Sequence, residues 1–167
     1  MPSAYDADIE SAAAQFLPQW DWRWLRAQLI AESNLNPDAV SSAGAQGIAQ
    51  IMPGTWNDLA SVLQFPATAT PFEARYAIQA AAWYMGLLRA AWRSPRPEAD
   101  RRRLSQASYN AGLGNLIDAQ KLAHGALDYA SIVARLPQVT GDANAEETTC
   151  YVNRIERIYT ELDHAGP

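Results

Sequence analysis

Apolar residues recur along most of the chain at intervals of three and four positions, the spacing of an amphipathic α-helix. Runs of β-branched residues are scarce, alanine is abundant, and no convincing β-hairpin pattern is present. Proline, glycine and asparagine punctuate the apolar segments, so they set the expected helix ends. We therefore predict an all-α fold. The expected helices cover residues 8–17, 22–33, 53–63, 72–92, 98–111, 113–123 and 146–162.

The second expected helix carries a glutamate on its apolar face. Asp21 is a plausible N-cap, and the segment that starts at Asn34 contains the stop signal Asn-Leu-Asn-Pro. Glu32 follows Leu29 by three positions and Leu25 by seven, so it shares their face of the helix. Burial makes a carboxylate costly to ionise, and we expect a raised pKa for Glu32. A neutral carboxylic acid in a cleft can act as a general acid.

The segment over residues 36–53 is rich in serine, glycine and alanine and has no helical or strand period. We predict a long structured loop, which in a compact domain is often functional. Gly44 and Gly47 allow its backbone to take positive φ or to approach a ligand closely. Two interpretations remain open for Ser41 and Gln50, which can bond to the loop itself or to a ligand.

Composition restricts the partners. The chain has 167 residues, enough for one domain with a core, and a net charge of -5, which argues against nucleic acid or an anionic membrane as partner. No apolar run is as long as a membrane span. The N-terminus shows no secretory signal, so we expect a chain that works where it is made, leaves by another route or has lost a leader.

One cysteine and two histidines are too few and too scattered for a recognisable metal site, so we expect no metal and no cofactor. Cys150 has no partner for an intrachain disulfide and is expected to be a buried small hydrophobic residue. The tryptophans are interpreted as core or helix-packing residues. Trp56, which follows the loop, is the better candidate for stacking on a ligand but is also expected to favour the core.

Three sequence blocks, in order, cover most of the chain. The first is Glu32-Ser33 followed by SSAGAQGIAQIMPGT at residues 41–55, the second is YNAG at residues 109–112, and the third is ETTCYV at residues 147–152. Together they resemble the catalytic domain of lytic transglycosylases of the soluble type, which is related to goose-type lysozyme. The resemblance implies a single lysozyme-like helical domain over residues 1–167, with a glycan-binding groove lined by the Glu32 helix and the following loop.

The resemblance also implies roles for single residues. Glu32 is the catalytic acid and later the base. The implied substrate-contacting residues are Ser41, Gln50, Met52, Tyr109, Asn110, Glu147 and Tyr151.

Within this set, the implied functions differ. Ser41 and Gln50 hydrogen-bond sugar substituents, and Met52 lines the groove floor. Tyr109 and Asn110 shape the cleft wall, with the tyrosine hydroxyl near the acid. From the last helix, Tyr151 approaches the acid, and Glu147 orients the loop. One departure is Ala49, where many members have methionine, and the shorter side chain is expected to widen a sugar subsite.

The implied reaction cleaves the β-1,4 bond between N-acetylmuramic acid and N-acetylglucosamine and leaves 1,6-anhydro ends. A single carboxylic acid can suffice because the substrate's N-acetyl group and 6-hydroxyl supply the other groups. The expected partner is the glycan strand of peptidoglycan, the expected place of action is the periplasm or cell wall, and a monomer is expected. A phage endolysin or virion lysin, a secretion-apparatus enzyme and a trimmed housekeeping enzyme all fit a chain of this length.

Two other functions remain open. A hydrolytic muramidase on the same fold needs a second carboxylate to position water, for which Asp38 and Asp58 are candidates by sequence proximity. A non-enzymatic glycan-binding component of a virion would bind without cleaving and would not depend on Glu32.

Overall fold

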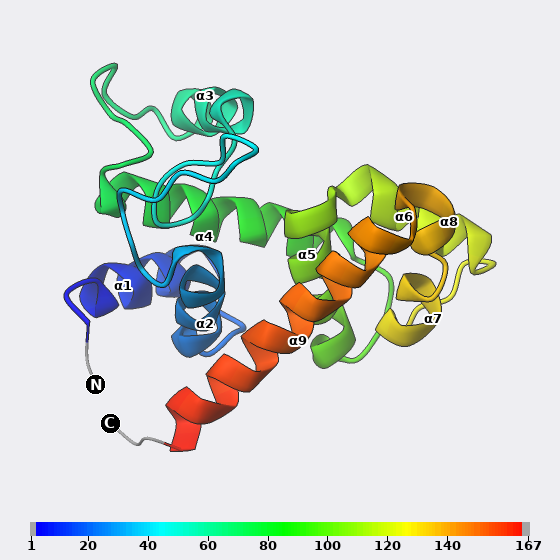
Figure 1. Cartoon of the computed structure of the whole chain (residues 1–167). Coiled ribbons are helices and arrows are strands. Elements are labelled where there is room, and N and C mark those ends of the chain that lie inside the picture. The colour runs from blue at the N-terminus through cyan, green and yellow to red at the C-terminus, as the bar shows by residue number, and fades with distance from the viewer. Residues whose placement is uncertain (1–2, 165–167) are drawn as a thin grey trace. The chain divides into compact units, whose positions relative to one another are not determined.

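The computed structural model describes residues 3–164, and within them it consists of helices joined by loops, with two isolated β-bridges and no strand (Figure 1). The all-α prediction is therefore confirmed. In chain order the helices are α1 Asp6–Phe16, α2 Trp22–Ser33, α3 Pro53–Val62, α4 Ala74–Ala91, α5 Glu98–Ala111, α6 Leu113–Leu122, α7 Tyr129–Val133, α8 Pro137–Thr140 and α9 Asp142–His164.

Two compact units make up the chain. The first unit contains Met1–Tyr84 and Ile155–Pro167, and the second contains Met85–Arg154. Helices α4 and α9 each contribute residues to both units. In the described residues, no helix is both long enough and apolar enough to cross a membrane.

In the first unit, α2 begins and ends where the sequence predicts. The Asp21 carboxylate accepts a hydrogen bond from the Arg23 main-chain nitrogen over 2.9 Å, which satisfies one of the unpaired amides at the helix start. At the other end Asn34 adopts the left-handed conformation, with φ 56°, in which asparagine often ends a helix. Pro53 occupies the first position of α3, also as predicted.

The last turns of α9 pack against the start of α2 within this unit. The rings of Trp24 and Tyr159 stack with centroids 3.6 Å apart and planes 4° from parallel. Arg23 pairs with the Asp163 carboxylate at 2.8 Å. These contacts hold α2, and with it the predicted catalytic glutamate, against the C-terminal helix of the described chain.

The second unit has a core formed by α5, α6, α7, α8 and the adjoining part of α9. Trp92 is 1% exposed, and its indole nitrogen donates to the Ser108 hydroxyl over 3.0 Å. Leu104, Leu116 and Ile132 pack in the same cluster and are fully buried. The short helices α7 and α8 pack against α6.

The sequence pattern does not predict α7 and α8, and it places the start of the last helix too late. With 5 and 4 residues, α7 and α8 are too short to display a helical period. Helix α9 begins at Asp142, directly after Gly141, whose φ of 85° makes it a natural breaker. Its first turn carries few apolar residues, so the pattern alone placed the start at residue 146.

The prediction for Cys150 was wrong, because this residue is exposed. Thr148 and Val152 on the same helix are buried. Two residues correspond to a rotation of about 200° around a helix, so Cys150 faces away from the side that these neighbours bury. Trp56, by contrast, is 6% exposed and belongs to the core, as expected.

Candidate functional site

Glu32 lies in the last turn of α2, one residue before the helix ends, and is half-buried. On the same face, Leu25 and Leu29 are each 1% exposed. The predicted placement of Glu32 beside this apolar stripe is confirmed. Its raised pKa stays a prediction.

The residue after Glu32 anchors the helix end to the loop that follows. The Ser33 hydroxyl donates to the main-chain oxygen of Ile48 over 2.8 Å and accepts from the Asn36 amide over 3.1 Å. Ile48 is fully buried, so the anchor point lies inside the first unit. Ser33 belongs to the first sequence block, but the resemblance implied no role for it. The sequence feature that could have indicated a role for Ser33 is its position directly after the predicted acid, Glu32.

Gln50 serves the internal structure of the loop. Its amide nitrogen donates to the main-chain oxygens of Ala39, over 3.2 Å, and Gly47, over 2.9 Å. Its backbone has φ 50°, an uncommon conformation for a residue with a side chain. Of the two interpretations left open for Gln50, self-bonding of the loop is thus observed, and the amide oxygen has no hydrogen-bond partner among residues 3–164.

Ser41 also bonds within the loop. Its hydroxyl oxygen accepts from the Ala45 amide over 3.0 Å, and its main chain bonds to Ala45 and Gly44. No acceptor for the hydroxyl hydrogen is found in the described part of the chain. Ser41 and Gln50 therefore each combine a structural bond with one polar atom that a ligand can use.

The end of the loop exposes an apolar side chain. Met52 is 45% exposed and directly precedes α3. Such a thioether can contact the flat apolar face of a sugar ring. Ala49, however, is 0% exposed and lies beneath the loop surface. Contrary to the expectation, its side chain therefore does not line an open sugar subsite.

In the second unit, the structure joins the second and third sequence blocks. The Thr148 hydroxyl, on α9, donates to the side-chain oxygen of Asn110, in the last turn of α5, over 2.7 Å. Thr148 is 1% exposed, whereas Asn110 is exposed. Tyr109 and Tyr151, the two predicted tyrosines of these blocks, are half-buried.

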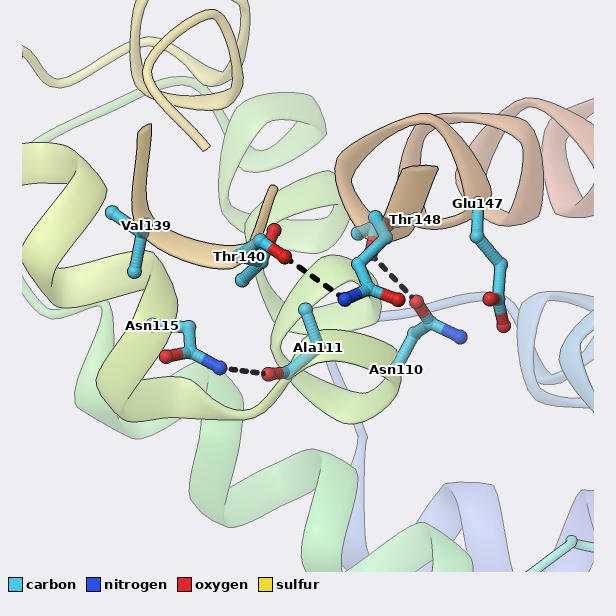
Figure 2. Close-up of a pocket in the computed structure, with 8 residues that line it drawn as sticks. Asn110, Ala111, Asn115, Val139, Thr140, Glu147 and Thr148 are labelled. Carbon is cyan, nitrogen blue, oxygen red and sulfur yellow. Dashed lines mark hydrogen bonds between the residues drawn. The ribbon is translucent and has the colours of Figure 1, made fainter. Parts of the chain in front are cut away.

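A polar pocket of about 340 Å³ opens beside this hydrogen bond (Figure 2). It brings together Asn110 and Glu147, which are predicted site residues, and others that sequence analysis missed. The missed asparagines, Asn115 and Asn144, each donate to the main-chain oxygen four residues earlier, a local pattern that the sequence hints at but does not single out. The lining residues are Asn110, Ala111, Asn115, Val139, Thr140, Asn144, Glu147 and Thr148.

The carboxylates proposed for the hydrolytic alternative lie in the first unit. Asp38 and Asp58 are both exposed. Within residues 3–164, no group of three or more histidine, cysteine, aspartate or glutamate side chains could hold a metal ion.

Comparison with known proteins identifies the class to which this helical chain belongs. Residues 11–132, more than half of the chain, match the family model described as the transglycosylase SLT domain. The chain belongs to this family, and the matched residues include the first two of the three sequence blocks.

Curated relatives extend the match to nearly the whole chain. The chain is 30% identical over 156 residues to a membrane-bound lytic murein transglycosylase F of Marinobacter nauticus, a match that covers 85% of this chain and 30% of the relative. It is also 30% identical over 172 residues to the protein of that name from Pseudomonas syringae pv. syringae, over 95% of this chain and 33% of the relative. The chain thus spans about a third of the length of these relatives.

Solved structures share the fold. The 70 kDa soluble lytic transglycosylase of Escherichia coli superposes with a TM-score of 0.75 at 22% identity, over 96% of this chain and 25% of that one. A complex of the 70 kDa enzyme with bulgecin A gives 0.77 at 24% identity, over 99% and 25%. An inactive glutamate-to-glutamine mutant of the lytic transglycosylase Slt from Pseudomonas aeruginosa gives 0.74 at 23% identity, over 99% and 25%. The lysozyme-like all-α fold is therefore confirmed.

Proposed function

We propose that this chain is a peptidoglycan lytic transglycosylase domain that cleaves the β-1,4 bond between N-acetylmuramic acid and N-acetylglucosamine. The observation that carries the proposal is the family match over residues 11–132, which includes a half-buried Glu32 at the end of α2. The curated relatives are named lytic murein transglycosylases, and one related structure is an inactive mutant in which glutamine replaces a glutamate.

In the proposed reaction, Glu32 first acts as an acid. The protonated carboxyl gives its proton to the bridging oxygen while the bond from that oxygen to C1 of the muramic acid breaks. The N-acetyl carbonyl oxygen of the same sugar stabilises the positive charge that develops at C1. The N-acetylglucosamine part leaves with a new hydroxyl.

Glu32 then acts as a base. The 6-hydroxyl of the muramic acid attacks C1, and the Glu32 carboxylate takes its proton. The product carries a 1,6-anhydro ring, the carboxyl is protonated again, and no water is consumed. General acid-base help of this kind accelerates a reaction by about 10²–10⁴-fold.

The first unit offers contacts to the sugars beside the acid. The Ser41 hydroxyl and the Gln50 amide oxygen supply one donor and one acceptor for sugar substituents, neither of which has a partner within residues 3–164. Met52 supplies an exposed apolar surface for a ring face. Because glycans carry hydroxyls, N-acetyl groups and apolar ring faces, this mixture suits them better than a charged surface would.

The second unit contributes the remaining proposed contacts. Tyr109 and Tyr151 are half-buried and keep part of their surface for a ligand, while Asn110 and Glu147 line the polar pocket. We propose that the domain acts as a monomer on glycan strands in the periplasm or on the cell wall.

The test replaces Glu32 with glutamine and measures the release of soluble fragments from purified sacculi. We expect the rate to fall by about 10²–10⁴-fold, the contribution of general acid-base catalysis. Glu10→Gln, which changes an exposed carboxylate on α1, is the matched control and should keep the wild-type rate. A near wild-type rate for the Glu32 variant would overturn the assignment of the acid.

Mass spectrometry of the released fragments tests the type of reaction. Fragments with 1,6-anhydro ends support a transglycosylase. Products heavier by one water show a hydrolytic muramidase instead. Binding to sacculi without any release by the wild-type chain would show a glycan-binding protein that is not an enzyme.

A further inference from the structure

Left-handed backbone conformations gather beside the proposed acid. In the described part of the chain, five residues other than glycine have a positive φ, and three of them lie within two residues of the Ser33–Ile48 hydrogen bond. They are Asn34, Leu35 and Gln50. Such conformations are uncommon for residues with a side chain. They cluster at functional sites, because they persist only where the surrounding structure enforces them.

The two remaining residues have an ordinary explanation at helix ends. Gln64, with φ 54°, follows the last turn of α3, and the Phe65 amide donates back to the Ala60 oxygen over 2.9 Å. His124, also with φ 54°, follows the end of α6. A left-handed residue that closes the last turn is a common way for a helix to end, and Asn34 has this role at the end of α2.

Leu35 needs a different explanation. The Asn36 amide donates to the Ser33 main-chain oxygen over 3.2 Å, so that Asn34 and Leu35 are the two central residues of a turn, with φ 56° and 60°. Positive φ at both central positions is the signature of a type I′ turn, in which glycine, asparagine and aspartate predominate. Asn34 suits this turn, but a leucine in the left-handed region is strained.

The turn orients the Ser33 side chain. The Asn36 amide also donates to the Ser33 hydroxyl oxygen over 3.1 Å, and that hydroxyl donates to the Ile48 main-chain oxygen over 2.8 Å. A hydroxyl has a single hydrogen, and an amide that occupies one of its lone pairs restricts the directions in which this hydrogen can point. If Leu35 left the left-handed region, the Asn36 amide would turn away and the hydroxyl would lose this constraint.

The residues after the turn are tied to the loop. The Asn36 side-chain oxygen accepts from the Asp38 amide over 3.0 Å, and its main-chain oxygen accepts from the Ala39 amide over 3.4 Å. The Ala39 oxygen in turn accepts from the Gly47 amide over 2.8 Å and from the Gln50 side chain over 3.2 Å. The turn is therefore held on both sides, which is the condition under which a strained backbone persists.

We propose that Leu35 is a positioning residue for Glu32. Its left-handed backbone places the Asn36 amide on the Ser33 hydroxyl, and this fixes the last turn of α2 against the loop that follows. A catalytic group displaced by about 1 Å can lose about 10²-fold in rate, so a strained turn that prevents the displacement can be retained. The role rests on the proposed function, and Leu35 acts on the acid only through Ser33, without touching the substrate.

Two substitutions separate the backbone conformation of Leu35 from its half-buried apolar side chain. Leu35→Asn loses the apolar surface but introduces a residue that tolerates positive φ. Leu35→Val keeps an apolar side chain, but a β-branched residue is strongly disfavoured at positive φ. Leu35→Ala is unbranched, should give intermediate results, and replaces Leu35→Val if that chain does not fold.

The first measurement is the release of soluble fragments over a range of sacculus concentrations, well below the thermal midpoint of every variant. We expect Leu35→Val to lower the maximal rate by about 10- to 100-fold and to change the half-saturating concentration by less than about twofold, because the acid is misplaced while substrate binding is kept. Leu35→Asn should keep the maximal rate within about threefold of the wild type, since its backbone conformation is retained.

Hydrogen exchange gives a second measurement that does not depend on cleavage. The Asn36 amide should exchange at least about tenfold faster in Leu35→Val than in the wild type, because it loses its bonds to Ser33. In Leu35→Asn its exchange should stay within about threefold of the wild type.

Gln64 offers the matched control. It is exposed, its φ of 54° is close to that of Leu35, and the bonds of its turn stay within residues 60–65. Gln64→Val introduces the same kind of strain and should lower the thermal midpoint by about 2–4 °C. The maximal rate and the exchange of the Asn36 amide should both stay within about twofold of the wild type, since this turn does not hold Ser33.

The opposite ranking would overturn the inference. A rate near wild type for Leu35→Val with an impaired Leu35→Asn would show that Leu35 acts through its apolar side chain. An equal fall in rate for Gln64→Val would show that strain at any turn suffices. A wild-type chain that cleaves nothing overturns the proposed reaction, whereas equal Asn36 exchange in Leu35→Asn and Leu35→Val overturns the constraint by the turn whether or not sacculi are cleaved.

Discussion

The hydroxyl of Ser33 donates a 2.8 Å hydrogen bond to the main-chain oxygen of Ile48, fifteen residues further along the chain. Ser33 directly follows Glu32, and Ile48 lies in the middle of the loop that carries Ser41, Gln50 and Met52. The bond therefore links the end of α2 to the loop, so that the proposed acid and the proposed sugar contacts of the loop keep one geometry.

Replacing Ser33 with alanine should loosen this link. We expect a loss of about 1 kcal/mol of stability for the hydrogen bond, together with a fall in sacculus cleavage, because misplacement of a catalytic group lowers the rate steeply. Urea denaturation and a cleavage assay measure the two effects. Ser11→Ala, on the exposed side of α1, is the control and should leave both unchanged.

Gly47 tolerates no side chain. A Cβ built on it would lie 1.9 Å from the Pro71 carbonyl oxygen, and its φ is 76°. Gly47→Ala should lower the free energy of unfolding by about 2–4 kcal/mol. The main chain must move away from the new Cβ, and alanine is strained in the left-handed conformation.

Gly44 is the matched position, with φ 89° and no neighbouring atom within 4 Å of the place that a Cβ would take. Gly44→Ala should therefore lower the free energy of unfolding by only about 1 kcal/mol, the strain of alanine in the left-handed conformation. Thermal unfolding of the two variants compares them, and equal losses would show that the contact with Pro71 is not limiting.

Thr148→Val keeps the shape of a buried side chain but removes the donor that holds Asn110. We expect the free energy of unfolding to fall by about 1–2 kcal/mol, since a hydrogen bond of a buried side chain is lost. The Asn110 side-chain amide signals should also broaden or split in the NMR spectrum. Thr149→Val, which removes only a bond to the Ala145 main-chain oxygen, should leave the Asn110 signals in place.

Asp21 links stability to pH. The hydrogen bond from the Arg23 side chain holds the pKa of Asp21 below its ordinary value of 3.8. Because the folded state binds the proton less readily than the unfolded state, this stabilisation is complete above the ordinary value and is lost as the pH falls through the lowered one.

Asp21→Asn retains a good N-cap but loses the charge. We expect it to be about 0.5–1 kcal/mol less stable than the wild type at pH 7, since the carboxylate is partly exposed. The difference should shrink below pH 4, roughly where aspartate titrates. Urea denaturation at several pH values measures it, and a constant difference down to pH 2 would contradict the charge-based explanation.

Features that depend on interactions between residues close in the sequence were predicted, whereas features that depend on packing between distant residues were not. Helix α5 was predicted at its observed bounds because Gly112 and Pro97 mark its ends in the sequence. Helices α7 and α8 were missed because they are stabilised by packing against α6, and their few residues display no period of their own.

The candidate site divides in the same way. Glu32 was found because a carboxylate among Leu25 and Leu29 conflicts with the apolar pattern around it. Asn115 and Asn144 were missed because asparagines near helix starts are common, and only the folded second unit shows that they line one pocket with Glu147.

The sequence by itself determined the all-α class, the bounds of α2 and α5, the position of Glu32 and the family to which the chain belongs. These features depend on periodicity, capping and motif order, which act over a few residues or are written directly in the chain. Only the tertiary structure decided that Cys150 is exposed, that Ser33 holds Ile48 and that Thr148 orients Asn110. Such contacts join residues distant in the chain, and their geometry arises from how the helices pack.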